Sequence, residues 1–146
     1  MTEINPSVVL KNMFAIASFQ DELPWQTFRE GVEIISLHQT TAPQTKTPWL
    51  GSEPQPGLHT ALLRYQPGAT VPYHHHPGSE QILVLAGAQQ DDRGIYPAGT
   101  LVVNPPGSNH RVASPEGCIV LVTWERPVIF QETDFQEADF QAAEPA

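Results

Sequence analysis

A short stretch in the middle of the chain, "PYHHHPGSE", carries three of the six histidines in adjacent positions, followed by a proline-glycine turn and Glu80. Successive side chains of an extended segment point to opposite faces, so His74 and His76 share one face and His75 lies on the other. Glu80 opens an apolar strand and has the parity of Ile82 and Val84. Its carboxylate should therefore face the core, where an unpaired charge is costly.

Two imidazoles and a carboxylate are a common ligand set for zinc, iron and manganese, so this spacing predicts a metal site. Three adjacent histidines also occur in purification tags and by chance in polar loops, but neither explains the glutamate. A fourth candidate lies in "NPPGSNH", where the rigid Pro-Pro-Gly turn presents His110 at the start of a short strand, "HRVA". His110 taken alone is typical of an ordinary loop histidine, and only the combination favours a ligand.

The composition indicates a single acidic domain. The chain has 146 residues, enough for one hydrophobic core and too few for two ordinary ones. Seven lysines and arginines against sixteen acidic residues give a net charge of −9, which disfavours binding to nucleic acid or to an anionic membrane. Cys118 is the only cysteine, so an intramolecular disulfide and a cysteine-based zinc ribbon are excluded, and a reducing compartment fits best. With no signal-peptide pattern and no apolar run long enough for a bilayer, we expect a cytoplasmic protein.

Fifteen prolines and ten glycines leave little room for long helices after about residue 28 and separate short β-rich runs. Regularly spaced short strands are typical of a sandwich or barrel, so the predicted fold class is all-β. The expected strands are 31–38, 59–65, 79–87, 99–104 and 118–124.

We expect three parts along the chain. Residues 1–22 form an N-terminal extension, with room for a short helix, that packs on the barrel or on a partner chain. Residues 23–128 form the barrel, within which the Thr/Pro-rich residues 39–57 form a surface loop. Residues 129–146 form an acidic C-terminal tail. A frayed tail is favoured over an intersubunit arm, because its phenylalanines lie five apart, which fits neither helix nor strand.

Two spaced motifs indicate the type of barrel. The fixed positions of the pattern G(X)5HXH(X)3E(X)6G are all present, at Gly68, His74, His76, Glu80 and Gly87. The pattern G(X)5PXG(X)2H follows at Gly99, Pro105, Gly107 and His110, with Ser114 where an asparagine usually ends the motif. The chain therefore resembles a cupin. The resemblance implies a single RmlC-like jelly-roll β-barrel and the metal ligands His74, His76, Glu80 and His110, with His75 pointing away.

Between Trp25 and Trp124 the chain is similar to ChrR-type cupin domains, through stretches such as "LLRYQPGATVPYHHHPGSEQILVLAG" and "GIYPAGTLVVNPPGSNH". That branch includes the metal-binding C-terminal domain of a zinc-dependent anti-sigma factor, and it is similar to acetylacetone-cleaving, dioxygenase-like cupins. The anti-sigma factor binds sigma through an N-terminal module with a His/Cys zinc site. The residues before the barrel are few here and lack cysteine, so sigma-factor inhibition is not carried over. Gln81 stands where the family often has a second glutamate.

The resemblance leaves the function open, because one barrel type hosts many activities. The first hypothesis is a non-haem metal-dependent dioxygenase that cleaves a small, diketone-like carbonyl compound, since three imidazoles and one carboxylate leave a six-coordinate ion two open positions. The second is a ChrR-like sensory or regulatory cupin, in which four protein ligands saturate a tetrahedral zinc. Metal-free sugar isomerase or epimerase chemistry is a third, which the complete ligand set disfavours.

Both leading hypotheses imply one divalent metal per chain, Fe(II) or Zn(II), with Mn(II) and Ni(II) as further candidates, and a small-molecule ligand or substrate. A homodimer is expected from the resemblance and from the apolar N-terminal residues, which a partner chain would cover. Candidates to line the site or support its ligands are Tyr73, Arg64, Tyr65, Gln81 and Trp124, for each of which a purely structural role is the alternative. No separate general base stands out.

The alternation of the three histidines makes a separable prediction. His76→Ala should abolish stoichiometric metal binding, because it removes a ligand, whereas His75→Ala should leave the metal content nearly unchanged. Metal content per chain, measured by mass spectrometry on tagless protein, checks both variants. Equal loss in the two would refute the alternating faces.

Overall fold

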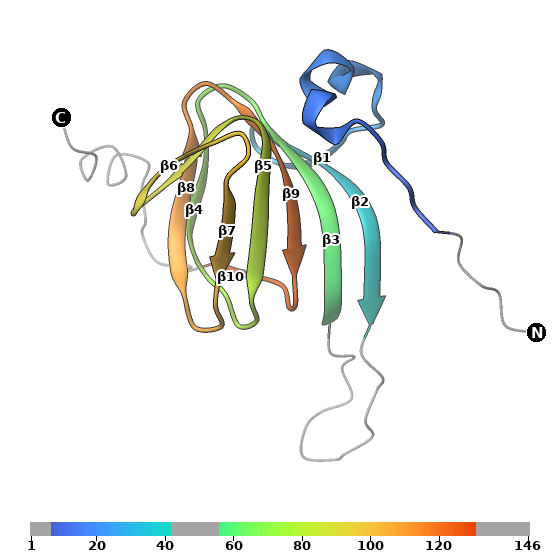
Figure 1. Ribbon diagram of the computed structural model, residues 1–146. Helices are drawn as coiled ribbons and strands as arrows, with labels where there is room; N and C mark the ends of the chain where they lie inside the picture. The colour runs from blue at the N-terminus through green and yellow to red at the C-terminus, as the bar shows by residue number, and fades with distance from the viewer. Residues whose placement is uncertain (1–6, 42–55, 131–146) are drawn as a thin grey trace, which may run out of the picture.

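Antiparallel strands form almost the whole of the described chain. The structure, a computed structural model, describes residues 7–41 and 56–130. Its elements are two short 3-10 helices and ten strands: η1 (Met13–Ser18), η2 (Gln20–Glu22), β1 (Gln26–Arg29), β2 (Val32–Thr41), β3 (Pro56–Tyr65), β4 (Ala69–His75), β5 (Glu80–Asp91), β6 (Gly94–Pro97), β7 (Leu101–Asn104), β8 (Asn109–Ser114), β9 (Cys118–Trp124) and β10 (Ile129–Phe130). The strands form one curled, jelly-roll sheet (Figure 1), which confirms the all-β cupin prediction. None of the helices in these two ranges is long and apolar enough to cross a membrane.

The strand order brings the two motif segments side by side. Along the sheet the order is β1-β2-β3-β9-β5-β8-β4-β10, and β6 and β7 also pair with β5. The first part of β5 pairs with β7 and β9, whereas its end pairs with β6 and β8. Since β8 also pairs with β4, the strand that carries His74 lies beside the strand that carries His110.

Apolar side chains pack on both faces of the curled sheet. On the inner face, Ile82 and Val84 are buried with the same parity as Glu80, as the sequence predicts. On the outer face, Leu62 belongs to a cluster that includes Ile16 of η1. The N-terminal helical turn therefore covers part of the outer face and leaves the inner face to the polar cluster described below.

The final glycine of the first motif allows two strands to approach closely. Gly87 has a φ of 70°, a conformation that glycine adopts without a steric penalty. A Cβ at this position would collide with the carbonyl oxygen of Gly117, which precedes β9. A bulge between Val84 and Ala86 adds to the bend of β5. The bend brings Glu80 and Asp91, the first and last residues of β5, to opposite sides of the same histidine, His110.

The expected strands are present, but several of their ends differ. The strand expected at 79–87 is the 12-residue β5, and the one expected at 99–104 begins only at Leu101. The sequence analysis did not anticipate β1, β4, β6 and β10, which are short, lie at a sheet edge or, in β4, contain a proline.

The segments expected as loop and tail overlap with strands at their borders. Within the expected surface loop 39–57, β2 continues to Thr41 and β3 begins at Pro56. Ile129 and Phe130, the first residues of the expected tail, pair with β4 as β10. The remaining residues of these two segments, 42–55 and 131–146, lie outside the described residues, as do residues 1–6.

The burial of Ile16 predicts that the N-terminal turn contributes to stability. Its side chain is fully buried, so Ile16→Ala should lower the free energy of unfolding by about 2–5 kcal/mol, the usual cost of such a truncation. Phe14 in the same turn is 77% exposed, and Phe14→Ala should cost less than about 0.5 kcal/mol. Urea unfolding of both variants measures the difference. Equal stabilities would mean that η1 does not pack as described.

Candidate metal centre

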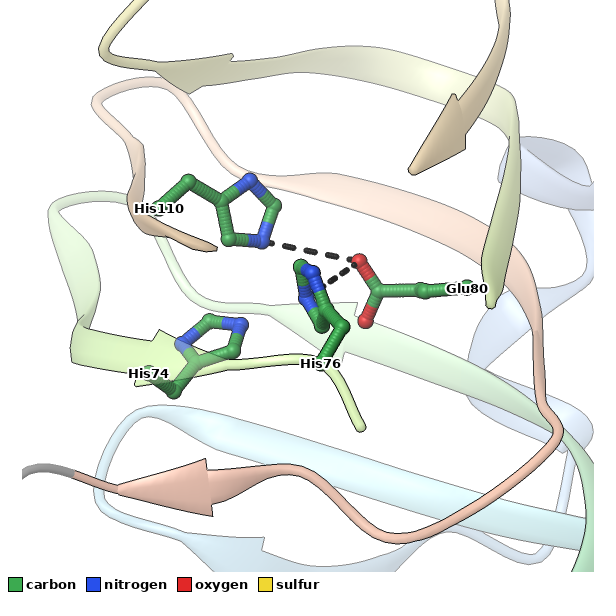
Figure 2. Close-up of side chains that lie close together, drawn as sticks. All are labelled: His74, His76, Glu80 and His110. Atoms are coloured by element: carbon green, nitrogen blue, oxygen red, sulfur yellow. Dashed lines mark ion pairs between the residues drawn. The ribbon is translucent and has the colours of Figure 1, made fainter. Parts of the chain in front are cut away.

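Four side chains converge inside the barrel: His74, His76, Glu80 and His110 (Figure 2). All four are buried, and the ring nitrogen or carboxylate oxygen that each can offer lies within 4.8 Å of the others. His75 is exposed, in agreement with the alternation of an extended segment. The structure thus brings together the four residues that the sequence singled out.

Backbone hydrogen bonds join the two segments that supply these side chains. His74 lies directly opposite His110 in the β4–β8 ladder. The backbone N–H of His76 donates to the carbonyl oxygen of Ser108 at 2.9 Å, and the N–H of Gly107 donates to the carbonyl oxygen of His76 at 2.8 Å. The Pro-Pro-Gly turn is therefore fastened to the histidine run, which fixes the distance between the imidazoles.

The Nδ1 atoms of His74 and His110 face oxygen atoms that can only accept. Nδ1 of His74 lies 2.9 Å from the carbonyl oxygen of Pro72, and Nδ1 of His110 lies 3.1 Å from Oδ2 of Asp91. Because a carbonyl and an ionised carboxylate cannot donate, both Nδ1 atoms carry a proton. In the neutral ring, the Nε2 atom of each histidine then holds a free lone pair.

Nδ1 of His76 also carries a proton, because it faces a serine hydroxyl that must accept. Its Nδ1 lies 2.9 Å from Oγ of Ser108, and that hydroxyl donates its own proton to the carbonyl oxygen of Pro105 at 2.6 Å. The hydroxyl must therefore accept from His76, which again leaves the lone pair on Nε2. The buried Nε2 atoms of His76 and His110 have no hydrogen-bond partner.

The carboxylate of Glu80 is held in place by two neutral donors. Nε1 of Trp124 donates to Oε2 at 2.7 Å, and Nδ2 of Asn104 donates to Oε1 at 3.1 Å. Nε2 of His76 and of His110 lie 3.2 and 3.5 Å from Oε1, but without the geometry of a hydrogen bond. Lone pairs of nitrogen and oxygen therefore face one another in a buried space.

The pKa values reflect this concentration of charge. Burial by itself raises the pKa of Glu80, but the contacts with His110 and His76 bring it below its ordinary value. Burial lowers the pKa of His74 to about 4, and the neighbouring His110 adds to this. Burial also lowers the pKa of His110, but Asp91 and Glu80 outweigh it and raise that pKa to about 9. The cluster therefore favours a positive charge at Nε2 of His110, either a proton or a metal ion.

The donor set fits a divalent metal ion. Buried acceptors that face one another are unfavourable unless a cation lies among them. Zinc binds imidazole nitrogen at about 2.0–2.1 Å, so ligands on opposite sides of an ion are about 4 Å apart, close to the spread of these four atoms. Hydrogen bonds from Nδ1 to carbonyl, hydroxyl and carboxylate oxygens are the usual way in which metal-binding histidines are oriented.

A comparison with protein families gives the same result as the geometry. The model of the ChrR Cupin-like domain matches residues 15–128, which include all four residues of the cluster. The chain belongs to the ChrR cupin-like family.

Individual relatives of this ChrR-like cupin have different described activities. A protein of Cereibacter sphaeroides named "Putative dimethylsulfoniopropionate lyase DddL" is 28% identical over 71 residues, which are 46% of this chain and 31% of that protein. The chain thus spans less than a third of the length of this curated relative.

Two solved structures share the cupin fold. An acetylacetone dioxygenase from Acinetobacter johnsonii has a TM-score of 0.62 at 17% identity, over 98% of this chain and 92% of the other. The complex of SigE with the anti-sigma ChrR from Rhodobacter sphaeroides has a TM-score of 0.54 at 22% identity, over 82% of this chain and 70% of the other. At these identities the likeness supports the fold alone.

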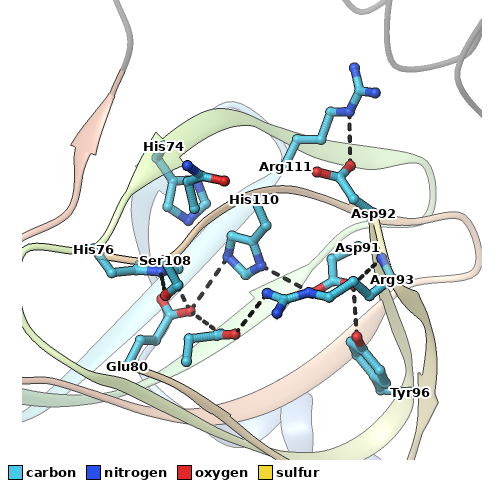
Figure 3. A network of polar contacts seen from close by, with 12 residues as sticks. His74, His76, Glu80, Asp91, Asp92, Arg93, Tyr96, Ser108, His110 and Arg111 are labelled. Carbon is cyan, nitrogen blue, oxygen red and sulfur yellow. Dashed lines mark hydrogen bonds and ion pairs between the residues drawn. The ribbon is translucent and has the colours of Figure 1, made fainter. Parts of the chain in front are cut away.

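A second buried carboxylate in this ChrR-like cupin orients His110 (Figure 3). Oδ2 of Asp91 faces Nδ1 of His110, while its Oδ1 accepts from the phenol of Tyr96 at 2.7 Å and from the backbone N–H of Arg93 at 2.8 Å. Burial raises the pKa of Asp91, but the hydrogen bonds from these donors lower it by more than burial raises it. The pKa is therefore below its ordinary value, and the carboxylate stays ionised. His110 therefore lies between two negative charges, Asp91 on one side and Glu80 on the other.

Arg93 links this network of hydrogen bonds to Glu80 by way of Asn104. The guanidinium of Arg93 donates to Oδ1 of Asn104 at 3.3 Å, which turns the amide N–H₂ of Asn104 toward Glu80. The sequence analysis did not single out Asp91, Asn104 or Ser108. Asp91 lies in a stretch, "QDDRG", that is typical of a turn, and nothing in the sequence distinguishes it from the exposed Asp92.

A small cavity of about 40 Å³ opens beside the cluster. His74, Glu80 and His110 form part of its wall, and most of the remaining wall is aliphatic or aromatic. The cavity is small, with room for about three water molecules, so it suits only a small ligand. Two of the expected lining residues, Tyr65 and Trp124, belong to this wall.

The other expected lining residues lie elsewhere. Gln81 is exposed, and Tyr73 donates from its phenol to Oδ1 of Asn109. Arg64 forms ion pairs with Asp21 and Glu33 in a separate, larger cleft of about 370 Å³. That cleft contains none of the four converging residues, so the candidate metal centre belongs to the smaller cavity.

The contact between Asp91 and His110 predicts a role in metal affinity. Asp91→Asn should weaken metal binding about 10- to 100-fold, the usual effect of losing a partner that orients a ligand. The neighbouring Asp92→Asn should change it little, because Asp92 pairs with Arg111 at the surface, away from the cluster. Competition for Zn(II) with a chromophoric chelator measures both affinities, and thermal melting checks that both variants fold. Unchanged affinity in Asp91→Asn would contradict the orienting role.

Proposed function

We propose that this ChrR-like cupin binds one divalent metal ion through His74, His76, Glu80 and His110 and cleaves a small dicarbonyl compound with dioxygen. The observation that carries the proposal is the inward-facing set of Nε2 lone pairs beside a cavity. When bound, the ion supplies Lewis acidity toward a carbonyl group and, if it is iron, reactivity toward dioxygen. Fe(II) is the proposed metal, with Mn(II) and Ni(II) as further candidates.

The residues of the chain itself hold and shield this chemistry. Trp124 and Asn104 hold the Glu80 carboxylate in one orientation. The aliphatic wall excludes bulk water from the cavity, which strengthens the electrostatic interactions inside it. Tyr65 lines the cavity with a phenol whose pKa is raised, first by burial, so it stays protonated at neutral pH.

The alternative is a sensory or regulatory cupin with a closed zinc site. Its support is the family relationship, together with the solved complex of the anti-sigma ChrR with SigE. In this alternative all four protein ligands complete a tetrahedral zinc and no position remains for a substrate. The cavity beside His74 and His110 favours the enzyme, because a closed structural site has no need of one.

We also propose that the chain forms a homodimer. Its support is a group of apolar side chains near the N-terminus that stay exposed: Val8, Val9, Leu10 and Phe14. Contiguous exposed apolar surface is typical of an interface. A monomer in sedimentation analysis at micromolar concentration would exclude this state.

Metal content and oxygen uptake together test the proposed enzyme. Tagless protein purified without chelators is analysed by mass spectrometry, then loaded anaerobically with Fe(II) and mixed with acetylacetone, other β-diketones and 2-hydroxy ketones. Iron near one per chain and substrate-dependent oxygen uptake are expected, and the uptake should persist in His75→Ala and disappear in His110→Ala.

Three other outcomes would change the assignment. Tightly held zinc without oxygen uptake after exchange would favour the sensory alternative. Dimethyl sulfide released from dimethylsulfoniopropionate, without oxygen uptake, would favour a lyase like the curated relative. Absence of any bound metal would remove the basis of the proposal.

A further inference from the structure

One permanent positive charge lies at the wall of the metal-site cavity. Among the described residues that line this cavity, Arg29 is the only lysine or arginine. It is the last residue of β1, at the edge of the sheet, and the metal-binding motifs do not include it. A second positive charge beside a site that favours a metal ion is stabilised if an anionic ligand lies near both.

An aromatic stack holds Arg29 close to the cluster. Its guanidinium carbon lies 4.4 Å from the ring centroid of Phe130, within the range of a cation–π contact. The ring of Phe130 lies in turn 5.5 Å from the ring of His74, and the two residues are paired between β10 and β4. The guanidinium is therefore separated from a ring of the cluster by one aromatic side chain.

Arg29 differs from the arginines that have structural partners. Arg64 pairs with Asp21 and Glu33, Arg111 pairs with Asp92, and Arg93 donates to Asn104. Within residues 7–41 and 56–130, no carboxylate lies within ion-pair distance of Arg29. Within these residues no carboxylate neutralises its guanidinium, whose N–H donors suit an anionic ligand.

The charge of Arg29 also acts inside the cavity. The pKa of Tyr65 is raised by burial and by nearby Cys118 and Glu80, whereas the positive charge of Arg29 lowers it. Tyr65 is a buried residue of the same wall, so the field of the guanidinium reaches the space where a ligand would lie.

From these observations we infer that Arg29 recognises a carboxylate, and that the preferred substrates are small oxo-carboxylate anions rather than neutral diketones. The inference rests on the proposed function, because it concerns the substrate of the same site. A guanidinium binds a carboxylate through two parallel hydrogen bonds, while the carbonyl end of the ligand is directed toward the metal-binding residues. The small cavity limits such a ligand to a short chain.

Acetoacetate and acetylacetone form a matched pair for the test. They contain the same number of non-hydrogen atoms, and one carries a carboxylate where the other carries a methyl ketone. Binding is measured by calorimetry on the Zn(II)-loaded full chain, which does not turn over with dioxygen, so a failure of the dioxygenase proposal leaves this measurement intact. Zinc stoichiometry is checked first for every variant.

The native chain should bind acetoacetate about 10- to 100-fold more tightly than acetylacetone, as expected for hydrogen bonds between charged groups. Arg29→Gln should lose this preference and leave the affinity for acetylacetone within about twofold. Arg29→Lys should retain part of it, because it keeps the charge without the paired donors. Lys11→Gln removes the same charge from an exposed position outside the barrel and should keep the full preference.

Several results would overturn the inference. Equal binding of the two ligands by the native chain, binding of neither, or a preference that survives Arg29→Gln would each show that Arg29 does not select a carboxylate. An equal loss of affinity for both ligands in Arg29→Gln and Arg29→Lys would mean that the arginine only stabilises the packing of the cavity wall. If Lys11→Gln lost the preference for acetoacetate as fully as Arg29→Gln, the effect would come from the net charge of the protein and not from the position of Arg29.

Discussion

The burial of one carboxylate is the constraint on which the rest of this structure depends. Glu80 lies inside an apolar barrel, where an ionised group without partners would be strongly destabilising. Trp124 and Asn104 satisfy part of its hydrogen-bonding capacity, and two imidazoles face what remains. In their neutral form those imidazoles are turned by their own partners so that the Nε2 lone pairs face the carboxylate. Such an arrangement opposes folding without a cation and is satisfied by one, so the burial of Glu80 and the tautomers of the histidines have the same explanation.

The sequence was sufficient for the cluster because its members lie close together in two short segments. The period of an extended strand separates His75 from its neighbours, and the rigid Pro-Pro-Gly turn before His110 has a fixed geometry. Neither inference needs knowledge of the tertiary structure. The resemblance to cupins added only the fact that the two segments meet, which the pairing of β4 with β8 confirms.

The supporting residues could not be predicted in the same way, because their roles depend on the curl of the sheet. Asp91 is eleven positions after Glu80, and an aspartate beside a turn is ordinary until the bend of β5 brings it to His110. Arg29 and Phe130 are far apart in the sequence, on edge strands that the pattern of short apolar runs did not indicate. Arg64 and Gln81, named as lining candidates with a structural role as the alternative, do not line the cavity. Their positions next to Tyr65 and Glu80 in the sequence do not place their side chains on the inner face of the sheet.

The metal ligands and much of the cavity wall come from different parts of the sequence, which helps to explain how one fold supports different activities. The motifs provide a place for a metal ion, which a sensor and an oxygenase can share, whereas the cavity wall comes partly from β1, β3 and β10, outside both motifs. Selectivity for a ligand must therefore come from the wall. The net charge of −9 is a poor guide to it, because exposed charges farther away than about 8–10 Å are largely screened at physiological ionic strength. A single guanidinium held at the cavity acts at shorter range and in a drier environment, so an acidic protein can still present a cationic site to a small anion.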